Sequence, residues 1–264
     1  MTTINQANAV YYRVGQLGGG AASAVYAGAV KVWPPVLTYP DVILGTAGLR
    51  AYWRMGEASG LLQDAKGTNH ASSFGGTPGY GAPGAVAGNT AVSFNGSAWF
   101  IIPDANALDF GNFPFTIEFW YKRTVNNVTE LLISKGNAFE IVQDGGNALY
   151  LANQSTPAAF GPVTTDTAWH YYAFVRPSAV VAETRVYRDG VDATASTGSS
   201  AFASNAQPLT FGGRGVLRDI LGDRLGDTVE PLAPGLLLHG VLDEIALYAV
   251  ALTPAQVLAH WNAR

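Results

Sequence analysis

Short apolar segments separated by turn residues constrain the fold of this chain more than any other feature of its sequence. The clearest is Phe115–Lys122, in which apolar residues at alternate positions would share one face of a strand. That face would carry Phe115, Ile117, Phe119 and Tyr121. The chain has 31 glycines and 14 prolines, which favour tight turns between short strands. This spacing is typical of an all-β sandwich.

Several further segments are strand candidates on the same grounds, whereas residues 64–90 are rich in Gly, Ser, Thr, Asn and Pro and are expected to form a long surface excursion. The strand candidates are Leu49–Met55, Ala91–Asn95, Ala98–Pro103, Leu131–Ser134, Phe139–Gln143, Ala148–Ala152, Trp169–Val175, Thr184–Arg188, Leu209–Gly212 and Leu237–Tyr248.

A helix is expected only at the end of the chain. Thr253 is placed to cap it, Pro254 suits the first helical position, and Gln256 follows three residues after the cap. Three apolar residues would dock this helix on the sandwich. They are Val257, Leu258 and Trp261.

The chain is predicted to have a small N-terminal arm and one large domain. In residues 1–33, the similar segments Ala9–Tyr12 and Ala24–Ala27 flank a glycine-rich turn and predict a β hairpin. An isolated hairpin is marginal in water, so this arm is expected to pair with another chain or pack on the main body. Residues 34–41 form a Pro-rich linker, and residues 42–264 form the main domain.

Composition excludes several classes of function. Hydrophobic residues make up 48% of the chain and charged residues 13%, which predicts a folded core. The net charge of −4, without a basic stripe, disfavours nucleic-acid binding. The absence of cysteine excludes disulfides and thiol chemistry. No signal peptide is readable in the first residues, and no apolar run reaches the roughly 20 residues needed to insert across a membrane.

The order of several motifs resembles the laminin-G-like jelly-roll family of concanavalin A-like sandwiches. The resemblance covers about residues 49–262 and implies an all-β jelly-roll sandwich with a short C-terminal helix and the small β arm before it. Two departures are Arg188, where an apolar residue is usual, and a longer connection, Arg214–Leu236, which could be a binding or assembly loop. The motifs are Tyr52–Gly60 followed by Asp64, Ala91–Ser97, Phe115–Trp120, Leu132–Gly136, Trp169–His170, Tyr187–Gly190 and Leu242–Ile245.

The N-terminal arm resembles something different. Ala24–Pro35 is similar to short segments that open tail and other virion proteins of bacteriophages. This resemblance implies a virion protein that is assembled in the host cytoplasm without a signal peptide. Residues 1–33 would contact other virion proteins, and the protein would be present as a homo-oligomer or in many copies.

No catalytic residue is predicted. Some relatives of this fold are glycosidases, which need two carboxylates that flank the sugar. The Glu-x-Asp-x-x-Glu pattern of the sandwich glucanases does not occur in this chain. Asp243 and Glu244 are adjacent, so they are expected to project to opposite faces of their strand. No Gly-x-Ser-x-Gly motif is present, and the four histidines lack metal-like spacing.

Two kinds of binding site remain. Sugar sites combine an aromatic platform with amide or carboxylate groups, and the candidate aromatic residues are Tyr80, Trp99, Trp120 and Tyr150. The alternative for Trp120 is that both faces of its strand are buried. The resemblance also implies a calcium site at the rim, with Asp64, Asn95, Asp104 and Asp243 as candidate ligands. The alternative is that these aspartates hold their own turns and a neighbouring loop.

The sequence thus favours a non-enzymatic bacteriophage virion protein, on the tail or the head, whose jelly roll binds host-surface carbohydrate. One alternative is a structural protein that decorates the capsid or stabilises the tail and binds only protein. Another is a carbohydrate-binding module of a bacterial surface.

Overall fold

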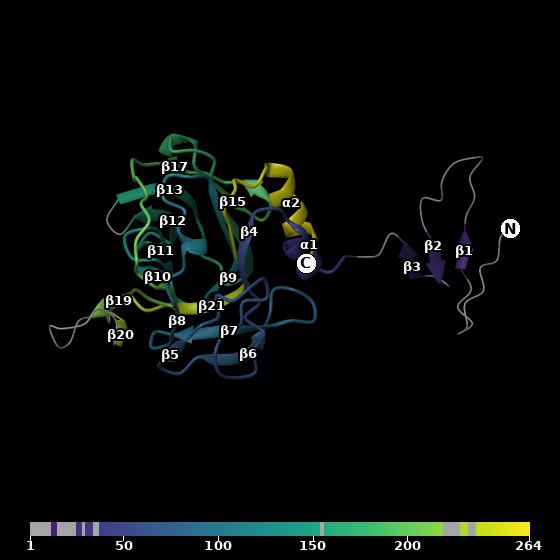
Figure 1. Cartoon of the computed structure of the whole chain (residues 1–264), viewed down its shortest axis with the longest axis horizontal. Helices are drawn as coiled ribbons and strands as arrows, with labels where there is room; N and C mark the ends of the chain where they lie inside the picture. Colours follow the sequence, from purple (N-terminus) through teal and green to yellow (C-terminus); the bar gives the residue numbers. More distant parts are fainter. Residues whose placement is uncertain are drawn as a thin grey trace.

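The computed structural model describes residues 12–14, 25–27, 30–33, 37–153, 156–218, 228–231 and 236–264, with side chains for residues 37–153, 156–214 and 236–264. Two antiparallel sheets of eight strands form the sandwich (Figure 1). The front sheet has the order β17 (Ser196–Thr197), β13 (Thr156–Val163), β12 (Ala148–Asn153), β11 (Glu140–Gln143), β10 (Glu130–Ser134), β18 (Leu209–Phe211), β8 (Trp99–Ile102) and β5 (Ser73–Gly75).

The back sheet contains the two longest strands. Its order is β16 (Val191–Asp192), β15 (Arg185–Arg188), β14 (Trp169–Arg176), β9 (Phe115–Arg123), β21 (His239–Tyr248), β7 (Thr90–Asn95) and β6 (Gly79–Pro83), and β4 (Leu49–Trp53) also pairs with β21. The expected all-β sandwich is confirmed.

The first core lies between the two sheets. The predicted inward face of β9 is confirmed, since Phe115, Ile117, Phe119 and Tyr121 are all buried there. Aromatic rings from the front sheet and its loops meet this face, and the ring of Phe115 lies 5.2 Å from that of Phe110. Large side chains from both sheets therefore fill the sandwich, as close packing requires.

A second core covers the outer face of the back sheet. Two helices, α1 (Tyr39–Gly45) and α2 (Pro254–Asn262), lie beside β4 and β15 (Figure 1). They bury Ile43 and Val257 against the outward side chains of β9, β14 and β21. Both faces of the back sheet are therefore buried, which explains why the apolar Trp120 stands on the outward face of β9.

The predicted C-terminal helix is confirmed, with one difference. Thr253 accepts a hydrogen bond from the Gln256 amide at 3.3 Å, and the Gln256 side chain accepts one from the Thr253 amide at 2.9 Å. Val257 and Trp261 pack on the second core, but Leu258 is 42% exposed and is not part of that core.

The expectation that only the chain end is helical is wrong, because α1 forms within and after the predicted linker. Its signal is a capping box, in which Thr38 and Asp41 bond to each other across the first turn, with Pro40 at the helix start. The helix spans only 7 residues, too few to show an apolar period. Short 3₁₀ turns occur at η1 (Asn106–Leu108) and η2 (Val181–Glu183).

The predicted surface excursion of residues 64–90 is also wrong in part, because β5 and β6 lie within it. Both strands stand at sheet ends and are rich in glycine, so they lack the alternation that identifies a strand. Gly75 is required by packing, since a Cβ there would lie 2.3 Å from the Trp99 ring. Strand β13 escapes prediction because Pro157 and Pro162 interrupt its sequence.

Two smaller sheets complete the described backbone. In the predicted arm, β1 (Tyr12–Val14) pairs with β2 (Val25–Ala27), which pairs with β3 (Val30–Trp33). The predicted hairpin thus gains a third strand. In the long connection, β19 (Gly215–Arg218) pairs with β20 (Thr228–Pro231). The described helices are too short to cross a membrane.

Strand β21 contains a β-bulge that changes which way its acids point. Asp243 stands opposite Trp120 of β9, but Ala246 stands opposite Glu118, so two residues of β21 face one of β9. Glu244 takes a φ of 51°, a left-handed conformation that is unusual outside glycine. The expectation that Asp243 and Glu244 project to opposite faces is therefore wrong, because the bulge turns both toward Asn89.

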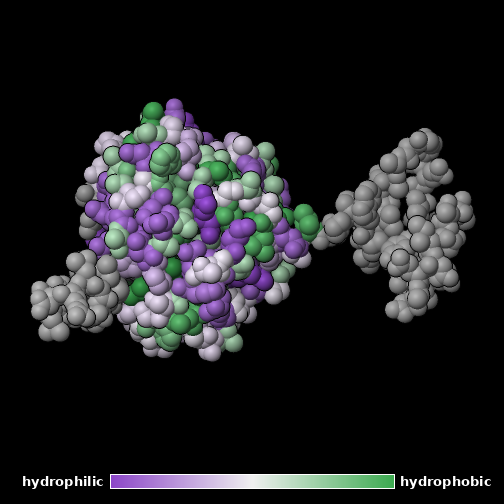
Figure 2. Space-filling view, viewed as in Figure 1, coloured by the Kyte–Doolittle hydropathy of each residue, from purple (hydrophilic) through white to green (hydrophobic). Residues whose placement is uncertain are grey.

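The described surface is mixed in character. Hydrophilic and hydrophobic residues are interspersed over the face of the sandwich shown in Figure 2. Large exposed apolar residues are present, of which Phe113 is the most exposed at 77%. Single exposed apolar residues are normal on a folded domain, so a functional site needs a more specific geometry.

Candidate functional site

Two of the four aromatic residues expected to contact sugar lie on the outer face of the front sheet. Tyr150, on β12, stands between Leu149 and Leu151 of the first core, so its ring points away from that core. Trp99, on β8, precedes Phe100 of the first core and likewise faces outward. Three strands separate β12 from β8. The two rings are therefore about 19 Å apart at the usual strand spacing and do not form one platform.

The other two aromatic candidates lie in the back sheet and stabilise the fold. Tyr80, on β6, packs against the first core and donates its hydroxyl to the carbonyl of Gly60. Trp120, on β9, is 2% exposed, and its indole N–H donates to the Tyr39 hydroxyl at 3.0 Å. Both faces of this strand are buried, so Trp120 presents no ring face to a ligand.

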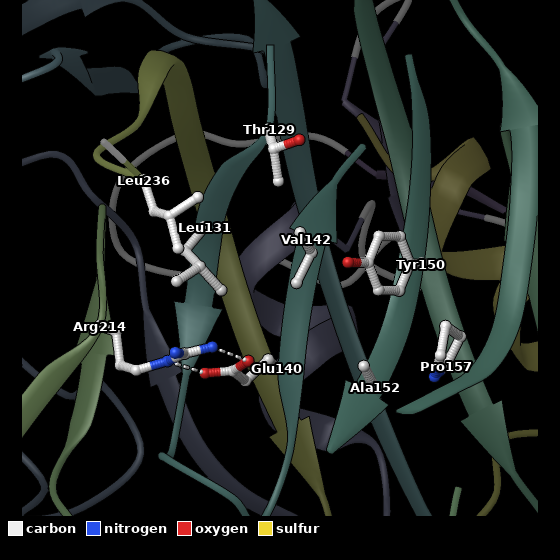
Figure 3. Close-up of a pocket in the computed structure, with 9 residues that line it drawn as sticks. All are labelled: Thr129, Leu131, Glu140, Val142, Tyr150, Ala152, Pro157, Arg214 and Leu236. Carbon is white, nitrogen blue, oxygen red and sulfur yellow. Dashed lines mark hydrogen bonds and ion pairs between the residues drawn. The ribbon is translucent and has the colours of Figure 1, made fainter. Parts of the chain in front are cut away.

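A pocket of about 260 Å³ lies beside the Tyr150 side chain on the outer face of the front sheet. Figure 3 shows its arrangement: Tyr150 and Pro157 on one side, Leu131 and Leu236 on the other, and Val142 between them. The pocket is lined by Thr129, Leu131, Glu140, Val142, Tyr150, Ala152, Pro157, Arg214 and Leu236.

The Tyr150 ring is held in place from behind. Phe160, on the neighbouring strand β13, packs against it with ring centroids 5.0 Å apart. Burial, followed by the nearby charge of Glu140, raises the pKa of the Tyr150 hydroxyl above its ordinary value. The hydroxyl is therefore protonated at neutral pH and available as a hydrogen-bond donor. The ring is half-buried and offers the rest of its surface to the pocket.

A buried ion pair forms one end of the pocket (Figure 3). Arg214 Nε donates to Glu140 Oε1 at 2.7 Å, and Arg214 Nη2 donates to Glu140 Oε2 at 2.6 Å. The Ser134 hydroxyl also donates to Glu140 Oε1 at 2.8 Å. This fork geometry fixes both side chains. Sequence reasoning missed this pair, since the partners are separated by 74 residues and no local spacing indicates their contact.

The long connection before β21 begins and ends at this pocket. Arg214 opens it, and Leu236 closes it by accepting a hydrogen bond from the Leu131 amide at 2.9 Å. This connection, Arg214–Leu236, is the one that the sequence indicates as a candidate binding or assembly loop. Both ends lie at the pocket, and the side chains of residues 215–235 lie outside the described residues.

A family model for the concanavalin A-like lectin/glucanases superfamily matches residues 94–258, more than half of the chain. The chain belongs to this superfamily. The match includes β9 to β14, which build both the first core and the pocket. A search of curated protein sequences found no match.

Solved structures with this concanavalin A-like fold are similar in shape at low sequence identity. The binding domain of botulinum neurotoxin DC in complex with SialylT has a TM-score of 0.56 and 11% identity, with 82% of this chain and 52% of that chain covered. Domain 4 of AbnA, an arabinanase from Geobacillus stearothermophilus in complex with arabinotriose, has a TM-score of 0.54 and 20% identity, with 80% and 97% covered. Trypanosoma rangeli sialidase has a TM-score of 0.56 and 14% identity, with 82% and 33% covered.

These similarities show the fold of the domain. The chain spans about half the length of the toxin binding domain that it matches. The arabinanase domain, in contrast, is matched over nearly its whole length.

The four candidate calcium ligands do not meet in this concanavalin A-like domain. Asp64 accepts backbone hydrogen bonds from Tyr52 and Lys66, both at 2.9 Å, and from Asn69 at 3.1 Å. Asn95 accepts from Ser97 within its own turn. These contacts are those of the alternative interpretation, in which the polar side chains hold their own loops.

Asp104, the third calcium candidate, binds a lysine instead. Lys135 is buried, and its Nζ lies 2.5 Å from Asp104 Oδ1 and 3.0 Å from Asp109 Oδ1. It also donates to the carbonyls of Asn205 and Gln207, both at 3.0 Å. An ammonium thus occupies the centre of this oxygen cluster. Among the described residues, no group of three or more His, Cys, Asp or Glu side chains is arranged to hold a metal ion.

Asp243, the fourth calcium candidate, belongs to a buried acid pair on the other side of the sandwich. Asp243 Oδ2 accepts from the Ala85 amide at 2.8 Å, and Asn89 Nδ2 lies 3.1 Å from Asp243 Oδ1 and 2.8 Å from Glu244 Oε1. Glu244 also accepts from the Tyr52 hydroxyl. Burial and the neighbouring Glu244 charge raise the pKa of Asp243 to about 8. Burial also raises the pKa of Glu244.

Glu118 forms a second buried acid site beneath the helices. Its carboxylate accepts from the hydroxyls of Tyr171 at 2.5 Å and Tyr248 at 2.8 Å, and lies 2.9 Å from His260 Nδ1. The other nitrogen of His260 lies 2.9 Å from the Thr46 hydroxyl. This network joins three strands of the back sheet to α2 and to the segment after α1. Such fully bonded buried networks stabilise one arrangement of their elements.

A second pocket, of about 350 Å³, lies at the ends of α1 and α2. Its one aromatic lining residue, Tyr39, is buried and bonds to Trp120, so it lacks the open ring found at Tyr150. The pocket is lined by Thr38, Tyr39, Pro40, Arg54, Val86, Ala87, Ala263 and Arg264.

Proposed function

We propose that this protein is a carbohydrate-binding protein without catalytic activity, which holds a sugar in the pocket around Tyr150. The observation that carries the proposal is the pairing, in one pocket, of an open aromatic ring with a buried and fixed polar group, Glu140–Arg214. The ring offers an apolar surface to the C–H face of a sugar, and the fixed polar group orients the sugar hydroxyls. Ligand pockets commonly combine an apolar lining with a few fixed polar groups in this way.

The pocket is prepared before a ligand arrives. Phe160 packs against the Tyr150 ring, and both carboxylate oxygens of Glu140 accept hydrogen bonds from Arg214. Binding therefore orders few side chains, and the entropic cost of association is correspondingly low. Thr129 at the opposite end adds a hydroxyl (Figure 3).

The similar structures support a binding role. The toxin domain was solved in complex with SialylT, and the arabinanase domain was solved in complex with arabinotriose. The proposal that this chain binds carbohydrate follows from the same fold together with its own pocket.

The absence of catalysis rests on the acids of the pocket. Glycoside hydrolysis uses two carboxylates on either side of the bond that breaks. Among the described residues that line the pocket, Glu140 is the only carboxylate, and it is bound by Arg214. A bound acid of this kind is poorly placed to donate or accept a proton.

We extend the proposal to a virion role, which rests on the sequence of the arm. The resemblance of Ala24–Pro35 to virion proteins of bacteriophages supports residues 1–33 as the part that contacts other virion proteins. Host-surface carbohydrate would then be the ligand of the pocket, and many copies on one particle would raise the overall strength of weak single contacts. Calcium dependence stays a prediction and is tested below with chelator.

The test of the sugar site is binding of the full chain to a panel of host-surface and plant-type glycans. Tyr150→Ala should weaken binding at least tenfold, about 1.4 kcal/mol, because Tyr150 is the one aromatic residue among the described residues that line the pocket. Phe113→Ala is the matched control, since it removes an exposed ring outside the pocket and should leave affinity unchanged.

Four results bear on this proposal. Equal affinity of wild type and Tyr150→Ala for the glycan would contradict the proposal that the sugar binds in this pocket. No binding to any glycan by the folded chain would favour the structural protein that binds only protein. Loss of binding in chelator would support a calcium site, and unchanged binding would contradict it.

The virion role has its own test. Deletion of residues 1–33 should abolish incorporation into particles while sugar binding by the remaining chain persists. Normal incorporation of the shortened chain would contradict the proposed role of the arm. If the full chain is incorporated into particles but binds no sugar, the capsid-decorating or tail-stabilising alternative is supported. If the full chain binds sugar but is not incorporated, the bacterial surface module is supported.

A further inference from the structure

We infer that the pocket takes an uncharged sugar and discriminates against sugars that carry a carboxylate, an inference that rests on the proposed carbohydrate-binding function. The reason is the state of its charged residues. Arg214 is the only cation among the described residues that line the pocket, and Glu140 already binds it through both Nε and Nη2. The cation that an acidic sugar needs is therefore occupied.

Burial makes this pairing difficult to exchange. The Glu140 side chain is 1% exposed and the Arg214 side chain 15%. A sugar carboxylate that drew Arg214 away would leave Glu140 buried without a cation, which is strongly unfavourable. A sugar carboxylate that left the pair intact would be desolvated beside another carboxylate, which is also unfavourable.

The surroundings of the pocket add negative charge. Asp144 is close enough to Tyr150 to act on its hydroxyl in the same direction as Glu140, and Arg214 alone opposes them. The remaining lining residues are uncharged. The electrostatic potential at the pocket therefore disfavours anions.

Hydroxyl groups meet none of these penalties. A sugar hydroxyl can donate to a lone pair of Glu140 that the fork leaves open, or accept from the Tyr150 or Thr129 hydroxyl. The apolar lining, from Leu131, Val142 and Pro157, suits the C–H face of a ring. The ion pair thus acts as a rigid, neutral hydrogen-bonding group.

The test is a glycan array probed with the full chain, in which neutral glycans are printed beside their sialylated or uronic acid counterparts. Lactose with 3′-sialyllactose, and a neutral galactose trimer with a galacturonate trimer, provide matched pairs for titration. We expect the neutral member of each bound pair to bind at least tenfold more tightly. Equal or tighter binding of the acidic member would overturn the inference and leave the carbohydrate-binding function standing. No binding of any glycan would overturn both.

A charge-release variant sharpens the test. Glu140→Gln keeps the shape and the oxygen acceptor but removes the charge that neutralises Arg214, so binding of acidic glycans should rise at least tenfold relative to wild type. Asp192→Asn is the matched control, because it removes an exposed acid outside the pocket and should change neither ligand class. If Glu140→Gln folds and acidic binding does not rise, the inference fails. If the Glu140→Gln variant does not fold, titration of the wild-type chain with the matched neutral and acidic glycans tests the inference on its own.

Discussion

The two outer faces of this sandwich are built from similar strands and are used differently. The outer face of the back sheet is covered by α1 and α2, and it buries Glu118, Asp243 and Glu244 in hydrogen-bonded networks. The outer face of the front sheet carries the pocket around Tyr150. A sheet with apolar residues on both faces needs a second layer on each face. The outer face of the back sheet is covered by α1 and α2.

The difference separates stability from recognition. Polar groups beneath the helices are bonded to each other and across elements, so their loss should weaken the fold. In the pocket, Glu140 and Arg214 bind each other beside the open ring of Tyr150. Substitutions of the pocket residues should therefore alter sugar binding more than folding.

The largest effect is expected at Glu118. Glu118→Ala would leave the Tyr171 and Tyr248 hydroxyls and the His260 imidazole buried without their acceptor. The free energy of unfolding should fall by about 3–5 kcal/mol, measured by urea denaturation. The affinity for sugar should not change at temperatures where the variant is folded.

The matched control is Glu183→Ala, which removes an exposed glutamate of η2 and should change stability by less than about 0.5 kcal/mol. If Glu118→Ala instead abolished sugar binding while leaving the unfolding free energy unchanged, the division between the two faces would be wrong.

An effect that depends on pH is expected from the titration of Asp243. Its folded-state pKa of about 8 lies above the unfolded value of 3.8. The folded protein therefore keeps a proton that the unfolded chain loses, and its stability falls as the pH rises from about 4 to about 8. The raised pKa of Glu244 acts in the same direction.

The side chain of the Asp243→Asn variant cannot titrate. As the pH increases from 5 to 8, the free energy of unfolding should therefore fall more for wild type than for the variant. Urea denaturation at several pH values measures the difference. Parallel pH profiles for the two proteins would contradict the account of this buried acid pair. Sugar binding should show no corresponding change with pH in the variant.

The regular parts of the fold were predictable from local sequence. Phe115–Lys122 shows its inward face by alternation, and Thr253 with Gln256 marks the start of α2. Local sequence failed where a partner far along the chain decides the structure. The strand β5 depends on the Trp99 ring that covers Gly75, and α1 is held by the second core.

The candidate site was predictable only in part for the same reason. Tyr150 could be proposed from residue type, but nothing near it indicates that Glu140 and Arg214 pair beside it. The acid pair of β21 was misread because a one-residue bulge reverses the direction of a side chain. Trp120 looked like a binding residue because the helices that bury it are distant in sequence.

The most direct test of the central claim is to locate a bound sugar by amide chemical-shift mapping of the full, isotope-labelled chain, using the tightest neutral glycan from the array. The account predicts shifts confined to the residues around Tyr150, Val142 and Leu131 on the front sheet. Shifts centred on the pocket at the ends of α1 and α2, or no shifts with any glycan, would contradict it.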